Sequence, residues 1–239
     1  MKDSNQLNDK IVAIIVAAGN GTRMQHELPK QYIKLGYFTI LEYTLEKFVN
    51  MAQIDRIIVV INEKDHYFNK LAISAHPKMT IAYGGKNRSD SVLAGLNMLQ
   101  NDEWALVHDA ARCCVTQTDI EKLIEAVLTK NQGGILATRV TDTIKKSVSE
   151  DSDLIKQTID RQQLWAAATP QMFKAGDLKQ GLLKAIHENR AITDEASAIE
   201  LINGKAQLVT CRKDNIKVTH NEDLALAKLY LQEQGLLTS

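Results

Sequence analysis

The chain has little cysteine and no excess of either charge, and each of these features excludes some classes of protein. Lysine and arginine number 29 among its 239 residues, as do aspartate and glutamate, so no overall field would draw in DNA, RNA or an anionic membrane. No apolar run is long enough to cross a bilayer, and segment 1–10 carries no apolar signal core. We therefore expect a cytoplasmic protein with no nucleic-acid or membrane partner, in which any phosphate binding is local.

The few cysteines and histidines also lack the spacing of a metal site. Three cysteines, two of them adjacent at Cys113 and Cys114, form neither a disulfide framework nor a zinc pattern, and we interpret them as reduced thiols in or near the core. The six histidines are scattered without ligand spacing, which argues against a metal site built by the protein alone. Any metal would arrive with substrate phosphates.

What the sequence does have is a regular alternation of strand and helix patterns. Apolar, β-branched runs predict strands at Ile11–Val16, Arg56–Ile61, Met79–Tyr83, Trp104–His108 and Gly134–Val140. Helical patterns lie between them at about Ile40–Asn50, Lys64–Ser74, Asp90–Leu99 and Asp119–Lys130. Because hydrophobicity within the strands is continuous, both faces of the sheet should be covered. The sequence predicts an α/β fold with a mainly parallel, helix-flanked sheet, in one domain spanning 1–239.

The pattern changes between Thr141 and Trp165, where a polar, charged run separates two short β-like stretches. This predicts a projecting hairpin, a β-arm at about 141–165, with a mobile surface loop as the alternative. A two-stranded ribbon is marginal alone in water, so a second subunit would steady it. Farther on we expect a helix near Gly176–Glu188, a helix opened by Thr193-Asp194, a strand at Gln207–Cys211 and a last helix at Glu222–Gln234.

The segment after the first strand is suited to hold phosphates. It reads Ala17-Ala18-Gly19-Asn20-Gly21-Thr22-Arg23-Met24, and Pro29-Lys30-Gln31 follows. Small residues and paired glycines let backbone N–H groups approach a ligand closely, while Arg23 and Lys30 add fixed positive charge. Ligands of parallel sheets bind at the carboxyl ends of the strands, where Gly84-Gly85 and His108-Asp109 also lie. The sequence therefore predicts a nucleoside triphosphate site.

Two familiar phosphate loops do not fit this segment. A P-loop would need a glycine at position 23 and a lysine at 24, where Arg23 and Met24 stand. A dinucleotide-binding loop needs a third glycine, and Asn62 stands where its acidic residue would end the second strand, so a dehydrogenase is disfavoured.

Plainer interpretations exist for several polar residues. Arg88, followed by Asp90 and Ser91, could simply begin a helix. His108-Asp109 invites a catalytic dyad, but neighbouring strand residues point to opposite faces, which makes a helper histidine the poorer choice. Residues such as Arg161 and Lys217 are ordinarily solvated surface charges.

Further segments keep a fixed order along the chain with the first loop. They are Gly84-Gly85-x-x-Arg88-x-Asp90-Ser91-Val92, His108-Asp109-Ala110-Ala111-Arg112, Asp142-Thr143-Ile144-Lys145, Asp160-Arg161-x-x-Leu164-Trp165, Thr169-Pro170-Gln171, Ile192-Thr193-Asp194-Glu195-Ala196-Ser197 and Asp214-Asn215-Ile216-Lys217-Val218-Thr219. From about Val12 to Tyr230 the chain thereby resembles the 2-C-methyl-D-erythritol 4-phosphate cytidylyltransferases, enzymes of the non-mevalonate isoprenoid pathway with a Rossmann-like nucleotidyltransferase fold. The resemblance implies transfer of CMP from CTP to that polyol phosphate, with Mg²⁺ and release of pyrophosphate.

The resemblance also implies roles for individual residues. Arg23 and Lys30 would stabilise the transition state, and Arg161 and Lys217 would hold the incoming phosphate, along a path lined by Thr143, Arg112 and Thr169. The CTP-binding residues would be Ala17, Ala18, Gly19, Asn20, Gly21, Gly85, Arg88, Ser91, Asp109 and Ala110. No side chain would hold Mg²⁺ directly, but Asp109 could reach it through water. Family members are homodimers whose arms carry the Thr143 and Arg161 equivalents into the partner's site.

The sequence departs from the family pattern at two positions, and two other functions compete with the one that the resemblance implies. Cys113 stands where the family usually has proline, and Lys86 where an acidic residue is frequent. Ribitol-5-phosphate cytidylyltransferase would use the same chemistry on another polyol phosphate, but Ala111 and the segments 142–145 and 214–217 favour the methylerythritol enzyme. A non-catalytic nucleotide-binding domain would have lost Arg23, Lys30 or Lys217, and all three are present.

Overall fold

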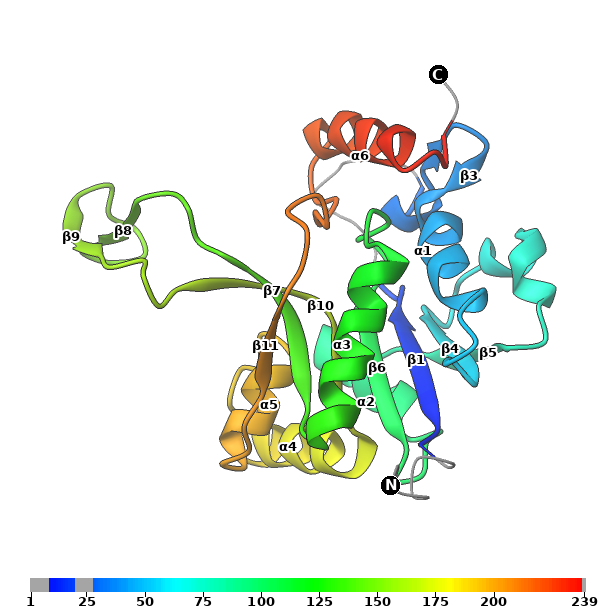
Figure 1. Ribbon diagram of the computed structural model, residues 1–239, viewed down its shortest axis with the longest axis horizontal. Coiled ribbons are helices and arrows are strands. Elements are labelled where there is room, and N and C mark those ends of the chain that lie inside the picture. The colour runs from blue at the N-terminus through cyan, green and yellow to red at the C-terminus, as the bar shows by residue number, and fades with distance from the viewer. Residues whose placement is uncertain (1–8, 20–27, 238–239) are drawn as a thin grey trace.

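The computed structural model describes residues 9–19 and 28–237, built on a seven-stranded sheet in the order β11-β7-β10-β6-β1-β4-β5 (Figure 1). Its strands are β1 (Ile11–Val16), β4 (Arg56–Ile61), β5 (Met79–Tyr83), β6 (Trp104–Asp109), β7 (Gly134–Arg139), β10 (Trp165–Lys174) and β11 (Gln207–Thr210). The α-helices are α1 (Ile40–Val49), α2 (Arg88–Leu96), α3 (Gln117–Lys130), α4 (Ala175–His187), α5 (Glu195–Leu201) and α6 (Glu222–Glu233).

Most of the sheet is parallel, as the continuous apolar runs predict. Strand β1 pairs in parallel with β4 and β6, and the β4–β5 and β7–β11 pairs are parallel too. Strand β10 alone runs antiparallel to its neighbours, β6 and β7. The strands expected from the sequence agree with the observed ones to within a residue at each end.

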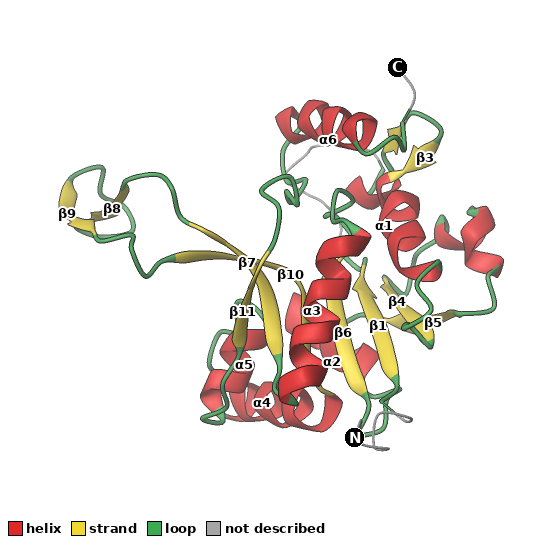
Figure 2. Cartoon of the chain, viewed as in Figure 1, coloured by secondary structure: helices red, strands yellow, loops and turns green. Residues whose placement is uncertain are grey.

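Helices cover both faces of the sheet, which explains why its strands are apolar throughout (Figure 2). Ala13 and Ile15 of β1 belong to the apolar cluster on the face of α1 and α3, whereas Val12 and Ile14 join α2, α4 and α5 on the other. All four side chains are fully buried. Alternate residues of one strand therefore anchor two helical layers.

The segment expected to form a helix at Lys64–Ser74 does not do so. It forms two short 3₁₀ turns, Phe68–Lys70 and Ala72–Ala75. The carboxylate of Asp65 accepts from the backbone N–H groups of Tyr67 and Phe68, at 2.9 Å each, and itself accepts from the Tyr32 hydroxyl at 2.7 Å. This local side-chain bonding competes with a continuous helix, and the prediction was wrong for that reason.

Strand β10 was not expected from the sequence. Its first half contains three consecutive alanines, and the strand is irregular between Ala167 and Gln171, next to the cis peptide Thr169–Pro170. Gln171 and Met172 nevertheless pair with both neighbouring strands. Tertiary pairing therefore overrides the weak strand propensity of this segment.

The predicted β-arm is present as an antiparallel pair, β8 (Ile144–Ser147) and β9 (Ile155–Ile159). It projects from the body beyond β7 and β10, whose last pair is Arg139 with Trp165 (Figure 1). The Arg139 guanidinium lies 4.5 Å from the centre of the Trp165 ring and braces the base of the arm.

A third apolar cluster lies under α6. It includes Leu35 of the short hairpin formed by β2 (Lys34–Leu35) and β3 (Phe38–Thr39). Cys113 and Cys114 are fully buried in this cluster, and Cys211 is buried elsewhere; all three are free thiols, as predicted. Within residues 9–19 and 28–237, no helix is both long and apolar enough to span a membrane.

Candidate active site

The carboxyl ends of β1, β5 and β6 meet around one hollow. Backbone bonds tie the segments after these strands to the sheet: Ala17 N–H donates to Val60 at 2.8 Å, Gly84 N–H to Ile61 at 2.8 Å, and Ala110 N–H to Val16 at 3.1 Å. The residues lining the hollow are Val16, Ala17, Ala18, Gly19, Lys30, Gln31, Gly85, Lys86, Asn87, Arg88, Ser91, Asp109, Ala110, Ala111 and Lys217. The predicted convergence of these loops is thus observed.

Two glycines after β5 permit this close approach. A Cβ on Gly84 would lie 2.5 Å from the Cβ of Ala18, and one on Gly85 would lie 2.4 Å from the Cβ of Asp90. Real Cβ contacts are not that short, so a larger residue at Gly84 would push the β5–α2 turn away from the loop after β1, and one at Gly85 would push it away from the first turn of α2.

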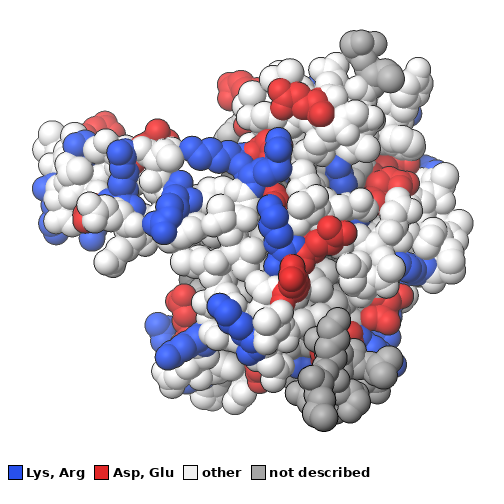
Figure 3. Space-filling view, in the orientation of Figure 1, with Lys and Arg blue, Asp and Glu red and all other residues white. Residues whose placement is uncertain are grey.

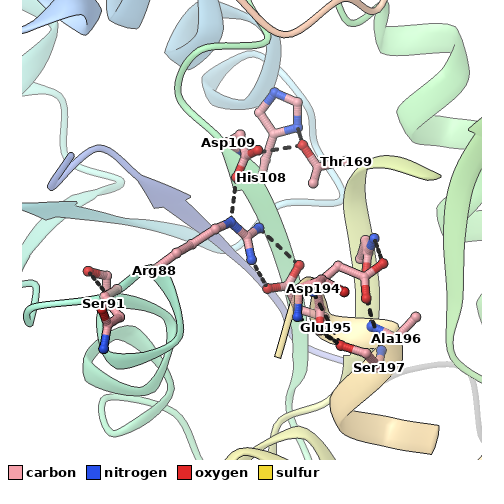
Figure 4. Close-up of polar contacts among 12 residues, drawn as sticks. Arg88, Ser91, His108, Asp109, Thr169, Asp194, Glu195, Ala196 and Ser197 are labelled. Atoms are coloured by element: carbon pink, nitrogen blue, oxygen red, sulfur yellow. Dashed lines mark hydrogen bonds and ion pairs between the residues drawn. The ribbon is translucent and has the colours of Figure 1, made fainter. Parts of the chain in front are cut away.

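Helix α2 begins at the edge of the hollow. Asn87 is its N-cap and forms a capping box with Asp90, so the simple helix-start interpretation is correct. Arg88, the first residue of the helix, nonetheless points into the site and contacts two carboxylates (Figure 4). Ser91, which is buried, donates to the Asn87 carbonyl at 3.1 Å. The segment is both a helix start and part of the hollow.

Asp109 is the charged centre of the site. Its Oδ1 accepts from Arg88 Nε at 2.8 Å, and its Oδ2 lies 2.7 Å from Lys217 Nζ. Burial acts to raise the pKa of Asp109, but the charges of Arg88 and Lys217 outweigh it and hold that pKa well below its ordinary value. The carboxylate is therefore ionised at any physiological pH.

A second hollow lies on the other side of this cluster. It shares Arg88, Asp109 and Lys217 with the first and is completed by Arg112, Ala167, Ala168, Thr169, Gln171, Thr193 and Asp194. Arg112 Nη1 donates to the Asn215 carbonyl at 2.7 Å, which fixes its guanidinium at the wall. Two of the predicted substrate residues, Arg112 and Thr169, are thus brought beside Lys217.

His108 lies on the opposite side of β6 from the hollows, as strand alternation predicts. Its ring packs 5.1 Å from that of Phe48. Its Nε2 lies 3.2 Å from the Arg112 carbonyl, so Nε2 carries the proton and Nδ1 accepts from the Thr169 hydroxyl at 3.0 Å. The Thr169 oxygen in turn accepts from the Asp109 N–H at 3.1 Å. Burial lowers the pKa of His108 to about 3, so the ring is neutral.

Lys30 approaches the hollow from the segment after the first loop. Its Nζ donates to the Val218 carbonyl at 3.0 Å, next to Lys217 in the chain. Gln31 fixes that segment, because its side-chain amide donates to the Ala17 carbonyl at 2.7 Å. The predicted residues Asn20, Gly21 and Arg23 lie outside the described residues.

Thr143 and Arg161 belong to the arm and line neither hollow. Both are exposed, and the Arg161 guanidinium donates to the Thr141 carbonyl. Figure 3 shows lysine and arginine side chains gathered on the arm and where it joins the body, in a chain without net charge. A single chain does not bring these two predicted substrate residues to its own hollows.

The donor set does not form a closed metal cage. Among the residues that the structure describes, no group of three or more His, Cys, Asp or Glu side chains could hold a metal ion. Asp109 is the ionised carboxylate that lines both hollows together with lysine and arginine. One carboxylate fits Mg²⁺ carried on substrate phosphates, because that ion keeps several waters and takes few protein ligands in such sites.

Sequence reasoning missed Glu195. The segment Ile192–Ser197 belongs to the family pattern and predicts a helix start, but neither gave Glu195 a role. Asp194 is indeed the N-cap of α5, with Ser197 completing a capping box. The next residue, Glu195, is buried and contacts Arg88 through both of its carboxylate oxygens. An acidic residue in a first helical turn ordinarily serves the helix dipole, so the sequence carried no signal for this contact.

Comparison with known proteins identifies the family of the chain. The family model for 2-C-methyl-D-erythritol 4-phosphate cytidylyltransferase matches residues 11–233. The enzyme of that name from Pectobacterium atrosepticum is 46% identical over 236 residues, which covers 97% of this chain and 98% of the relative. The one from Shewanella halifaxensis is 47% identical over 228 residues, covering 95% and 98%.

Solved structures show the same likeness. The crystal structure of the Francisella tularensis 2-C-methyl-D-erythritol 4-phosphate cytidylyltransferase superposes with a TM-score of 0.80 at 37% identity, over 93% of this chain and all of that one. The fold, the convergent loops and the matched length lead to one assignment. This chain belongs to the 2-C-methyl-D-erythritol 4-phosphate cytidylyltransferase family.

Proposed function

We propose that this protein transfers the CMP moiety of CTP to 2-C-methyl-D-erythritol 4-phosphate, giving 4-diphosphocytidyl-2-C-methyl-D-erythritol and pyrophosphate. The observation that carries the proposal is the pair of hollows that share Arg88, Asp109 and Lys217. One extends to the loops after β1 and β5, which suit a nucleotide, and the other is bordered by Arg112 and Thr169, which suit a phosphorylated polyol. Two substrates would therefore meet at the shared wall.

The reaction needs two anions brought together. A phosphate oxygen of the polyol phosphate attacks the α-phosphorus of CTP in line, a new P–O bond forms, and pyrophosphate leaves with the electrons of the broken bond. Negative charge spreads over the five-coordinate phosphorus. Lys30 and Arg23 would stabilise that charge, while Lys217 would hold the attacking phosphate. No protein nucleophile is required.

The nucleotide would lie along Ala17, Ala18 and Gly19, with its base and ribose near Gly85 and Ser91. Arg88 closes this hollow at the start of α2, and Ala110 closes it beyond β6. Asn20 and Gly21 would continue the loop around the triphosphate. Mg²⁺ would be bound by the CTP phosphates, with Asp109 reaching it through water, and when bound it would neutralise phosphate charge.

The protein would act as a homodimer whose arms are exchanged. The arm exposes Val148, Leu154 and Ile155, between 57% and 72% of each residue, and such an apolar ribbon gains stability when another subunit covers it. Thr143 and Arg161 would then complete the substrate hollow of the partner. Free thiols support the cytoplasm as the compartment.

The test is CTP-dependent release of pyrophosphate in the presence of Mg²⁺. Methylerythritol phosphate and ribitol 5-phosphate are compared at equal concentration, and each component is omitted in turn. We expect strong preference for methylerythritol phosphate. Preference for ribitol 5-phosphate would reassign the substrate and keep the chemistry. Release with neither, in a protein that binds CTP, would contradict the catalytic proposal.

A further inference from the structure

Helix α5 begins at the wall of the second hollow, and its start is held from two sides. Asp194 accepts from the Ser197 N–H at 3.0 Å within the capping box. Gln171 of β10 accepts from the Ala196 N–H at 2.9 Å and donates to Asp194 at 3.0 Å. Figure 4 shows this helix start, with Asp194 and Ser197, beside Arg88. The first residue of α5 is thereby fixed relative to the sheet.

That first residue is Glu195, whose side chain is only 2% exposed. Its two oxygens accept from Arg88 Nη1 at 2.6 Å and Nη2 at 3.1 Å. A bidentate pair fixes the plane of the guanidinium as well as its position. The remaining donor used, Arg88 Nε, points to Asp109 Oδ1 at 2.8 Å. Glu195 itself lines neither hollow.

The geometry leaves Asp109 with two differently used oxygens. Both terminal nitrogens of Arg88 donate to Glu195, so Arg88 reaches Asp109 through Nε alone. Oδ2 of Asp109 contacts Lys217 Nζ at 2.7 Å and faces Arg112 Nε at 4.0 Å. Without the Glu195 charge, Arg88 could turn its fork onto both oxygens of Asp109 or onto substrate phosphates, and it would displace Lys217.

We propose that Glu195 is a positioning residue for the transfer reaction: it holds Arg88 so that the guanidinium contacts Asp109 at one oxygen only. This inference rests on the proposed function, in which Asp109 and Lys217 face the reacting phosphates. Glu195 acts through Arg88 and touches no substrate.

Glu195→Gln tests the proposal because it keeps the shape and one acceptor oxygen but removes the charge. We expect kcat/KM for CTP to fall about 10-fold or more, and CTP affinity measured by calorimetry with Mg²⁺ to weaken, since hydrogen bonds to charged groups carry such energies. Glu195→Asp keeps the charge but is one methylene too short for the fork, so it should show a smaller fall in the same direction. This second variant decides the matter if Glu195→Gln does not fold.

The matched control is Glu103→Gln. Glu103 is also buried and paired with an arginine, Arg56, at 2.9 Å, but it precedes β6 at the end of the strand opposite Asp109. It should lose stability as Glu195→Gln does and keep wild-type kinetics well below its Tm. A purely structural Glu195 would behave in the same way, so folded Glu195 variants with wild-type kcat/KM and CTP affinity would overturn the proposal.

A double-mutant cycle tests whether Glu195 acts through Arg88. If Glu195 works through Arg88, adding Glu195→Gln to Arg88→Lys should lower CTP affinity no further than Arg88→Lys does alone. Full additivity of the two losses would overturn that route. CTP affinity is measured without the second substrate, so this test of Glu195 does not depend on which polyol phosphate is the acceptor. An incorrect acceptor would be revealed by the turnover assay instead.

Discussion

At the scale of single residues, the end of β6 places two titratable side chains next to each other and drives their charge states apart. Asp109 faces three cations, Arg88 and Lys217 closely and Arg112 at 4.0 Å, and stays ionised. His108 lies on the other side of the strand, fully buried against Phe48. The neutral ring accepts from Thr169, whose oxygen accepts from the Asp109 backbone. A neutral His108 thus helps to hold the chain at Asp109 in place.

This arrangement predicts a pH dependence of stability. The pKa of His108 is lowered to about 3 in the fold, whereas an unfolded histidine has a pKa of about 6.5. Between these values the unfolded chain binds a proton that the folded chain does not. The contribution is fully present above about pH 6.5 and is lost as the pH falls toward 3, at up to about 1.4 kcal/mol per pH unit.

The measurement is the free energy of unfolding in urea between pH 7 and 4. His108→Asn, which cannot titrate, should be less stable at pH 7 but show a shallower loss on acidification than the wild type. His66→Asn is the control at an exposed position and should follow the wild-type slope. Equal slopes for His108→Asn and the wild type would mean that His108 takes up its proton as readily in the fold as in the unfolded chain, which would contradict the lowered pKa.

At the scale of elements, the position of α5 depends on a close contact with α4. A Cβ placed on Gly181 of α4 would lie 2.3 Å from the backbone oxygen of Ala198 in α5. Backbone cannot yield as a flexible side chain does, so an alanine would force the helices apart. Because α5 carries Glu195 in its first turn, such a shift would be transmitted to Arg88.

Gly181→Ala should therefore lower both stability and CTP affinity. Overpacking costs about 1–3 kcal/mol, which exceeds the roughly 0.5–1 kcal/mol that alanine contributes over glycine inside a helix. Urea unfolding and calorimetry with CTP and Mg²⁺ measure the two effects. Gln180→Ala, at an exposed position of the same helix, should change unfolding by less than about 0.5 kcal/mol. A Gly181→Ala protein more stable than wild type would show that the helices separate freely.

Most helices and strands could be predicted from the sequence, whereas strand β10 and the role of Glu195 could not. The buried parallel strands carry an unambiguous apolar pattern, and the two glycines after β5 mark where the chain must approach its neighbours closely. Strand β10 was not predicted because its alanines have little strand propensity and its pairing is entirely long-range. The contact of Glu195 was not predicted because its partner, Arg88, is 107 residues away in the sequence.

At the scale of the whole molecule, the arm separates two groups of predicted site residues. Lys30, Asp109 and Lys217 line the first hollow of the body, while Thr143 and Arg161 lie on the arm that projects from it (Figure 1). An arm that extends away from its own body can serve a site only in another copy. The chain as a whole has no net charge. In a closed dimer with composite sites, cations from both subunits would nevertheless gather at each site.

Composite sites predict recovery of activity when two inactive proteins are mixed. Lys30→Ala should lose at least roughly 10²-fold in turnover, as removal of a preorganised charge does, and Arg161→Ala should also be impaired. In a mixed dimer, one site would receive both defects, and the other would combine an intact Lys30 with an intact arm from the partner. After refolding an equal mixture, about a quarter of wild-type activity should return, because half of the dimers are mixed and each holds one intact site.

The control for this experiment is a mixture of Lys30→Ala with Lys217→Ala. These two lysines belong to the same body, since Lys30 Nζ lies 3.0 Å from the carbonyl of Val218, the neighbour of Lys217. Every site in such mixed dimers lacks one lysine, so no recovery is expected. If the Lys30→Ala and Arg161→Ala mixture stays as inactive as this control, although size-exclusion chromatography shows mixed dimers, then Arg161 does not act in the partner's site, and the arm serves assembly alone.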